Sequence, residues 1–356
     1  MIRTRPGIVT GIRRQRPGIS WVDLELEDGP ARGINFTHLT GPISVGQRVI
    51  LNTTAVELGL GSGGWHFIIH IEGQEHLDPS PGGHIMKLRY TPLQLKVCSI
   101  EEEASPHHAI LEEKDSLDGL PVIVGTLHSQ LVPALVAALE ERPGLSIAYI
   151  MTDGAALPIS FSDTVAKLRD RGLLAGTITI GHAFGGDLEA VNIYSGLLAA
   201  KWVLGAQLAI VTMGPGTVGT GTPWGSTSLE QASILDAVHA LKGVGIALLR
   251  LSFADPRERH RGISHHCLTS LARLTYSPAH VVVPRMKEGA KAAFIEAQLK
   301  ALPPRHPIVY ASGERGLAAL SRDQWQVTTM GRSLAEDREF FQSACAAGEY
   351  GSSLIN

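Results

Sequence analysis

The chain has 356 residues, of which 44% are hydrophobic, which is enough for a sizeable core and for one or two domains. No stretch suits a signal peptide or a membrane span, and a formal net charge of −3 gives no overall attraction to nucleic acid or anionic membranes. The three cysteines are widely separated without a CxxC pair, which argues against a disulfide framework and a thiolate zinc site and favours the reducing cytoplasm.

Residues 1–75 are expected to form a small antiparallel β-barrel of the OB or SH3 type. Val22, Leu24 and Leu26 alternate with acidic residues, as in a half-buried strand, and turn signals separate five such short strands. Five arginines precede the first acidic residue: Arg3, Arg5, Arg13, Arg14 and Arg16. They would suit a nucleic-acid-binding barrel, but few aromatic residues for base stacking lie among them. A solvated face or a domain interface is therefore the favoured interpretation.

Residues 76–119 are predicted to be a linker or a clasp between domains. A turn-rich stretch leads to residues 85–97, which fit one strand pair interrupted at Pro92, and then to a charged segment. We expect His107 and His108, which fall in the charged segment, to be surface residues.

Residues 120–356 predict a doubly wound α/β domain with a mostly parallel sheet. Apolar runs alternate with helical segments, and continuous Val, Ile and Leu runs are typical of parallel strands that are buried on both faces. The strand candidates are residues 120–128, 145–153, 176–182, 208–214, 245–253, 279–284, 306–312 and 325–331.

Polar residues follow several of these strands, and the carboxyl ends of parallel strands lie at one edge of a sheet. His128, Asp153, His182 and Asp255 follow successive strands, and Asp187 comes shortly after His182. We expect His182 to act as a general acid or base, and Asp153 or Asp187 to orient it or to help hold a metal. Alternatively, Asp187 caps the next helix.

Two glycine-rich turns at this edge are predicted to bind a ligand through main-chain amides and hydroxyls. The first contains Gly185 and Gly186. The second contains Gly214, Gly216, Thr217, Gly219, Thr220, Gly221 and Thr222. Its "GPGTVG" matches the dinucleotide pattern GxGxxG weakly, because no helix follows at once, and the absence of GxxxxGK[ST] excludes a P-loop. A phosphate or another anion is the expected ligand, and a long ordered loop at a domain interface is the alternative.

The loop after the fifth strand adds further candidates. Its arginines could clamp an anionic substrate: Arg257, Arg259 and Arg261. A zinc or manganese site is the alternative, built from His182, His260, His265 or His266 with Asp153 or Asp187. His265 and His266 are expected to point to different parts of a helix surface, and Cys267 to lie in the core.

Several segments together resemble a bacterial family that is catalogued as a domain of unknown function, number 3866. They are "LNTTAVELGLGSGGWHF", "GHIMKLRYTPLQ", "MTDGAALP", "GHAFGGDLEAVN" and "GPGTVGTGTPWG". The resemblance extends over nearly the whole chain. It implies a bacterial, cytoplasmic protein and assigns no residue a role.

Three functions stay open at this point. The leading hypothesis is an enzyme that hydrolyses or transfers a group on a phosphorylated or otherwise anionic small molecule, with a divalent metal as an optional cofactor. The second is a non-catalytic ligand-sensing or assembly protein, and the third is a nucleic-acid-associated protein that uses the barrel. A homo-oligomer is compatible with each.

Overall fold

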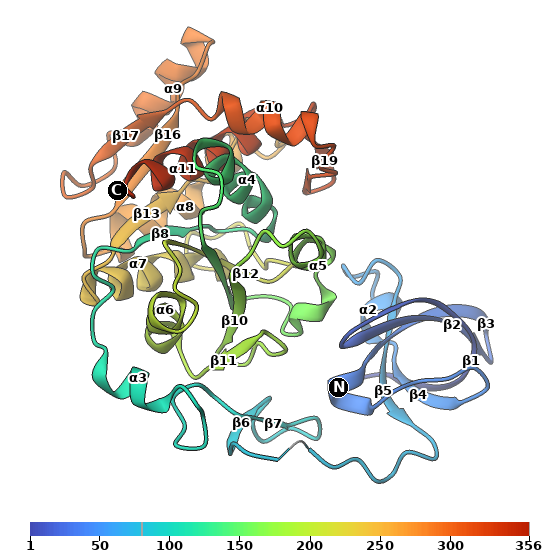
Figure 1. Cartoon of the computed structure of the whole chain (residues 1–356). Helices are drawn as coiled ribbons and strands as arrows, with labels where there is room; N and C mark the ends of the chain where they lie inside the picture. Colours follow the sequence, from blue (N-terminus) through green and yellow to red (C-terminus); the bar gives the residue numbers. More distant parts are fainter. Residues whose placement is uncertain (80, 356) are drawn as a thin grey trace. The chain divides into compact units, whose positions relative to one another are not determined.

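The computed structural model describes residues 1–79 and 81–355, which divide into two compact units (Figure 1). The first unit comprises Met1–Cys98 and Ser160–Asp163, and the second comprises the other described residues. No described helix combines the length and apolar character that crossing a membrane requires.

The first unit contains the predicted barrel. Its strands are β1 (Thr4–Arg16), β2 (Ile19–Leu26), β3 (Gly29–Phe36), β4 (Arg48–Asn52) and β5 (His66–Ile71). They close in the order β1-β2-β3-β5-β4, because β1 also pairs with β4, and the inward residues form a separate hydrophobic core. One pair, β3·β5, is parallel, which strand alternation could not indicate. This Greek-key arrangement confirms the barrel and favours the OB alternative.

Short elements complete the first unit: α1 (Thr37–Thr40), α2 (Thr54–Glu57), β6 (Ile85–Lys87) and β7 (Leu95–Val97). The antiparallel pairing of β6 with β7 confirms the strand pair predicted around Pro92. Four of the N-terminal arginines form ion pairs with acids of the same unit: Arg3 with Glu57, Arg13 with Asp23, and both Arg14 and Arg16 with Asp163.

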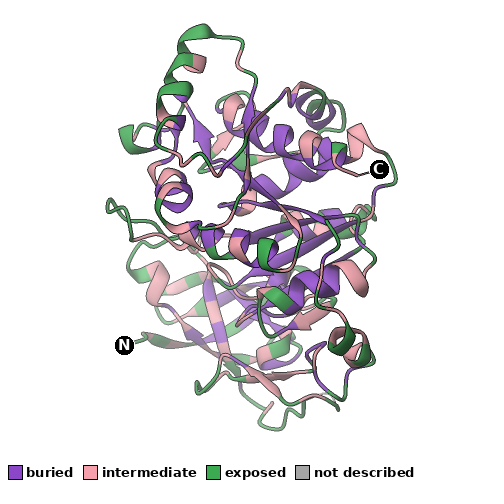
Figure 2. Cartoon of the chain, turned by 90° about the vertical axis from the view of Figure 1, so that its left-hand side faces the viewer, coloured by how far each residue is buried: buried purple, intermediate pink, exposed green. Residues whose placement is uncertain are grey.

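The second unit is built on an eight-stranded sheet in the order β11-β10-β9-β12-β8-β13-β16-β17, in which every pair is parallel. Figure 2 shows its strands as an almost continuously buried layer. The strands are β8 (Pro121–Val124), β9 (Ile147–Thr152), β10 (Gly176–Ile180), β11 (Leu188–Ala190), β12 (Leu208–Met213), β13 (Val244–Leu248), β16 (His280–Pro284) and β17 (Ile308–Ala311).

Helices cover both faces of this sheet, and a hydrophobic cluster fills the space on each side. One face is covered by α4 (Leu131–Glu141), α5 (Asp163–Asp170), α10 (Glu314–Arg322) and α11 (Arg338–Ser353). The other is covered by α6 (Ile193–Trp202), α7 (Glu230–Ala240), α8 (His265–Thr269) with a π-helical turn (Ser270–Leu274), and α9 (Gly289–Leu299). The short α3 (His108–Glu113) precedes the sheet. The predicted doubly wound α/β fold is therefore confirmed.

Two details differ from the sequence-based expectation. The predicted strand at 325–331 does not join the sheet: it supplies β18 (Thr328–Thr329), which pairs only with β19 (Arg332–Ser333). The edge strand β11 was not predicted, because three residues are too few to show a period. A second small pair joins β14 (Leu251–Ser252) to β15 (Gly262–Ile263) and closes the base of the loop between them.

The path of the chain leaves a crevice at the carboxyl ends of β12, β8 and β13. The central strand β8 leads into α4 on one face, whereas its neighbours β12 and β13 lead into α7 and α8 on the other face. Adjacent strands whose connections leave in opposite directions keep the loops apart, and ligands bind at such switch points.

Close packing of α11 on α4 gives a test of the fold. A Cβ added at Gly348 would lie 2.0 Å from the Ala134 carbonyl oxygen. We therefore expect Gly348→Ala to lower the free energy of unfolding by about 1–3 kcal/mol, measured by urea denaturation. The control is Gly289→Ala in the first turn of α9, where a Cβ meets open space and stability should be unchanged or higher. Equal stability of wild type and Gly348→Ala would contradict the packing.

Candidate functional site

The structure brings two of the three predicted acid–base residues together. The His182 main-chain N–H donates to Asp153 Oδ2 at 2.9 Å, just past the carboxyl ends of β10 and β9. Asp187 lies at the opposite edge, where its Oδ2 accepts from Thr177 N and Oγ1 at 2.9 and 2.7 Å. The chain has to return to that edge to begin β11 parallel to β10. The predicted capping role of Asp187 is wrong, since Asn192 caps α6.

The first glycine-rich turn uses its amides internally. The Gly185 N–H donates to Glu189 Oε1 at 2.6 Å, and the Gly186 N–H donates to Thr179 Oγ1 at 3.1 Å. These two amides are therefore engaged within their own loop and sheet edge.

The second glycine-rich turn runs along the carboxyl edge. At its start Gly214 packs against the Ala156 carbonyl oxygen, 2.4 Å from where a Cβ would lie. In its middle Thr217 and Gly219 line a cavity. The remaining predicted residues, Gly216, Thr220, Gly221 and Thr222, are not in that lining, and the Thr220 N–H closes the tip by donating to the Gly225 carbonyl at 2.7 Å.

This cavity lies at the carboxyl ends of β8, β12 and β13 and has a volume of about 90 Å³. This space is large enough for a small anion such as phosphate. Its lining combines hydroxyls with cationic and imidazole side chains, among them Thr126, Ser226, Ser264, Arg250, Arg257, His260 and His266. We call it the carboxyl-edge cavity.

A buried carboxylate organises the cations of the carboxyl-edge cavity. The Asp255 side chain is 0% exposed and accepts from Arg250 at 3.1 Å and from both Nε and a terminal nitrogen of Arg257 at 2.9 and 2.8 Å. Arg332 lies 3.6 Å from the same carboxylate and bonds the buried Asp337 at 2.9 Å. Burial opposes ionisation of Asp255, but the bonds and charges of Arg257 and Arg250 outweigh it and hold its pKa far below the usual range.

Three histidines adjoin these arginines. The ring centroids of His265 and His266 are 3.8 Å apart, and His260 lies 5.2 and 5.9 Å from them. Burial lowers the pKa of His260 to about 3 and that of His265 to about 4, and the neighbouring arginines act in the same direction. Burial also lowers the pKa of His266. The three rings are therefore neutral at pH 7, and we call them the imidazole cluster.

The imidazole cluster differs from the expected orientation of two of its histidines, and it also concerns the expected metal site. His265 and His266 do not point to different parts of the surface, because their rings lie side by side, tilted by 37°. Across residues 1–79 and 81–355, no group of three or more His, Cys, Asp or Glu side chains is arranged to hold a metal ion. Cys267 is buried, as predicted, and its Sγ accepts from the Arg250 main-chain N–H at 3.3 Å.

Glu230 was missed by the sequence analysis. It lies in the first turn of α7 and accepts a hydrogen bond from Thr152 Oγ1 at 2.7 Å, and it packs so closely on Gly154 that a Cβ there would lie 2.7 Å from Glu230 Oε2. Burial raises the pKa of Glu230 to about 7, and the charge of Asp153 adds to the rise. A carboxyl group that titrates near neutral pH is suited to general acid–base catalysis.

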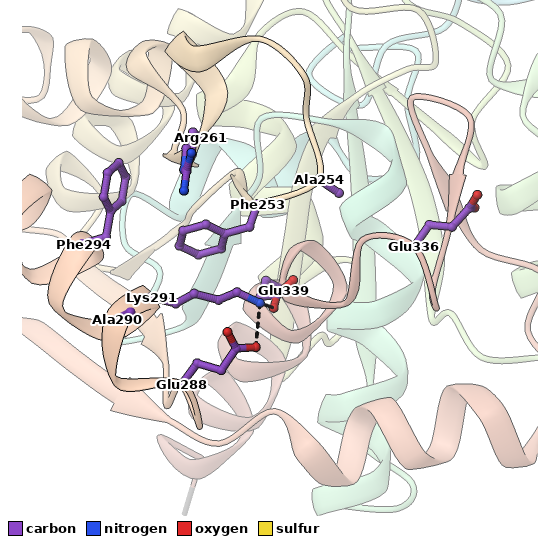
Figure 3. Close-up of a pocket in the computed structure, with 9 residues that line it drawn as sticks. All are labelled: Phe253, Ala254, Arg261, Glu288, Ala290, Lys291, Phe294, Glu336 and Glu339. Carbon is purple, nitrogen blue, oxygen red and sulfur yellow. Dashed lines mark hydrogen bonds and ion pairs between the residues drawn. The ribbon is translucent and has the colours of Figure 1, made fainter.

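A larger cavity of about 440 Å³ lies on the other side of the loop between β14 and β15 (Figure 3). Phe253 and Phe294 meet edge to face in its wall. Its lysine, Lys291, bonds both Glu288 and Glu339, at 2.8 and 2.6 Å. With Arg261 and Lys291 against three glutamates, the lining carries more negative than positive charge, so the smaller carboxyl-edge cavity is the better anion site.

Of the missed residues, Arg250 left a signal in the sequence and Glu230 did not. Arg250 interrupts the apolar run "GIALLRLSF", and a charged residue in a doubly buried strand needs a partner. Glu230 follows "STSL" at the start of a helix, where an acid is expected only to favour the helix dipole. The signal of Arg250 was visible, whereas the role of Glu230 depends on β9 and β12 being neighbours.

Comparison with known proteins adds a family but no activity. The family described as "Protein of unknown function (DUF3866)" matches residues 32–348. No curated protein and no solved structure matches.

The unusual pKa of Glu230 predicts a pH-dependent stability. Between about 4.5 and about 7 the native state binds more protons than the unfolded chain, so the charge of Glu230 costs stability increasingly as the pH rises. We expect Glu230→Gln to raise the free energy of unfolding at pH 8 by roughly 2 kcal/mol, and the gain to shrink toward pH 5. Urea denaturation at both pH values measures this, with the exposed Glu103→Gln as control. The same gain at both pH values would contradict it.

Proposed function

The chain belongs to the DUF3866 family of proteins of unknown function, and we propose that it is an enzyme that binds a phosphorylated or otherwise anionic small molecule in the carboxyl-edge cavity. The proposed reaction is hydrolysis or group transfer. The family description assigns no activity, so the proposal rests on the site alone.

One observation carries the proposal: the charged side chains at the cavity include more cations than anions. Three arginines, Arg250, Arg257 and Arg332, surround two carboxylates, Asp255 and Asp337, which leaves one positive charge while the histidines are neutral. Arg250 is only 9% exposed, so solvent screens this charge weakly. An anion in the cavity would balance it, and the surrounding hydroxyls can donate further hydrogen bonds.

The catalytic part of the proposal places acid–base chemistry on Glu230 and Asp153. These carboxyl groups interact, and the pKa of Glu230 near 7 lets it give or take a proton at neutral pH. The glycine-rich turn supports the connection, because its start packs on the loop after β9 and its middle lines the cavity. His182 adjoins Asp153 through its main chain.

The other functions remain as outcomes of the test. Binding without turnover would favour a ligand-sensing protein. A nucleic-acid role of the barrel is less favoured, because Arg3 and Arg13 pair with acids. The cytoplasm is the proposed location, which the spacing of the three cysteines supports.

A thermal-shift experiment tests the anion site. Phosphate, pyrophosphate, nucleotides and sugar phosphates are added against sodium chloride at matched ionic strength. A ligand at 100 times its Kd stabilises the native state by about 2.7 kcal/mol, so at least one should raise Tm by several degrees. We expect Arg250→Met to abolish the rise and Arg250→Lys to retain part of it. Arg315→Ala, at an exposed ion pair with Glu141, is the control and should keep it.

Two outcomes of this experiment would contradict the proposed anion site. No Tm rise with any anion in the wild type would overturn the proposal. An equal rise in wild type and in both Arg250 variants would place the ligand elsewhere. Circular dichroism checks that the variants are folded. We expect them to fold, because Arg257 still pairs with Asp255 when Arg250 is replaced.

A further inference from the structure

His266 has two buried ring nitrogens that make no hydrogen bond of standard geometry within the protein. The side chain is 4% exposed and lines the carboxyl-edge cavity. Neither Nδ1 nor Nε2 makes a hydrogen bond of standard geometry among the described residues, although the Thr220 and Pro223 carbonyls face the ring, and Nε2 of His265 is likewise unbonded. A buried polar atom without a partner costs stability and calls for an explanation. A ligand in the cavity that bonds these nitrogens supplies one.

The surroundings keep the imidazole cluster neutral while no anion is bound. Burial is the largest cause, and the charges of Arg250, Arg257 and Arg259 add to it. Asp255 opposes them, but its charge is shared with the arginines. Uncharged groups also adjoin the cluster: the Ser264 hydroxyl, which bonds His260 Nδ1 at 2.8 Å, and the carbonyls of Thr220 and Pro223 beside His266. The Cys267 thiol and the Thr126 hydroxyl line the same cavity.

The charge of the site does not match a phosphoryl dianion. Arg259 is exposed, so solvent screens its charge, and the other three arginines with the two aspartates leave one positive charge. A bound dianion would therefore bring one uncompensated negative charge into a buried space. Such a charge is costly, and proteins avoid it by moving a proton. The nearest groups able to accept a proton are the rings of the imidazole cluster. Because His265 and His266 are 3.8 Å apart, repulsion between two imidazolium ions limits the uptake to one proton.

We infer, resting on the proposed function, that the carboxyl-edge cavity binds a tetrahedral dianion, as in a phosphate monoester, together with one proton that the imidazole cluster takes up. The bound state is then electrically neutral, and His266 donates a hydrogen bond to the ligand. A carboxylate monoanion is already matched by the single positive charge and binds without a proton. The site therefore selects phosphoryl groups over carboxylates more strongly as the pH falls.

Sulfate and acetate are the probes for this inference. Sulfate is a dianion at every pH used and cannot carry the proton itself, and acetate is a monoanion. Isothermal titration calorimetry is performed at pH 7.5 in two buffers that differ in ionisation enthalpy, so that the difference in heat counts protons. We expect about one proton per sulfate and none per acetate. Sulfate affinity should rise by about tenfold per pH unit between pH 8 and 6.

His266→Phe keeps a ring but removes both nitrogens. We expect it to lose proton uptake and most of the pH dependence of sulfate binding while it still binds acetate. His239→Ala, at an exposed position, is the control and should bind sulfate with the same proton uptake as the wild type. Acetate binding also shows that the variant site is folded.

The outcomes separate this inference from the proposed function. Sulfate binding without proton uptake, or with uptake unchanged in His266→Phe, overturns the inference and leaves the anion site standing. Failure of sulfate, phosphate and acetate all to bind the wild type overturns the proposed function and this inference together.

Discussion

The carboxyl-edge cavity depends on one buried carboxylate. Asp255 ties Arg250, at the end of the β13 segment, to Arg257 in the following loop, and Ser252 donates to Asp337 beneath them at 2.9 Å. Removing one partner of a buried ion pair typically costs about 3–5 kcal/mol, because the other charge stays buried. Ion pairs thus hold the loop in place. They also hold the arginines of the cavity in place, so a ligand does not have to order these side chains.

Two buried glutamines hold the strand ends that carry these loops. Gln231 Nε2 donates to the carbonyls of Val124 and Leu248 at 2.8 and 3.0 Å, and so joins the ends of β8 and β13. Gln130 accepts from the amides of Thr126 and Leu127 and donates to the Leu249 carbonyl. These carbonyls and amides lie where the sheet ladder stops, and unpaired buried main-chain groups are costly. The side chains that satisfy them also open the crevice.

The fold followed from the sequence more fully than the site did. Apolar runs and the alternation in the barrel reflect local burial, which a sequence shows directly. Which residues lie close together depends on the order of the strands in the sheet, and a sequence does not show that order. Asp187 is five residues from His182 yet lies at the other edge, because β11 runs parallel to β10. Arg250 and Thr217 are 33 positions apart and line one cavity, because β12 and β13 flank β8. Only Thr217 and Gly219 of the predicted ligand residues belong to that cavity's lining.

The imidazole cluster shows how local rules can be broken at a site. Adjacent neutral rings beside arginines, with unbonded buried nitrogens, stabilise the fold less than apolar side chains of equal size would. Such local inconsistency is expected where binding compensates for it. In the inferred bound state, the same groups supply what the permanently protonated arginines cannot: a place for one proton. The unbonded nitrogens would therefore lower the stability of the fold only while the anion is absent, and anion binding would stabilise the carboxyl edge.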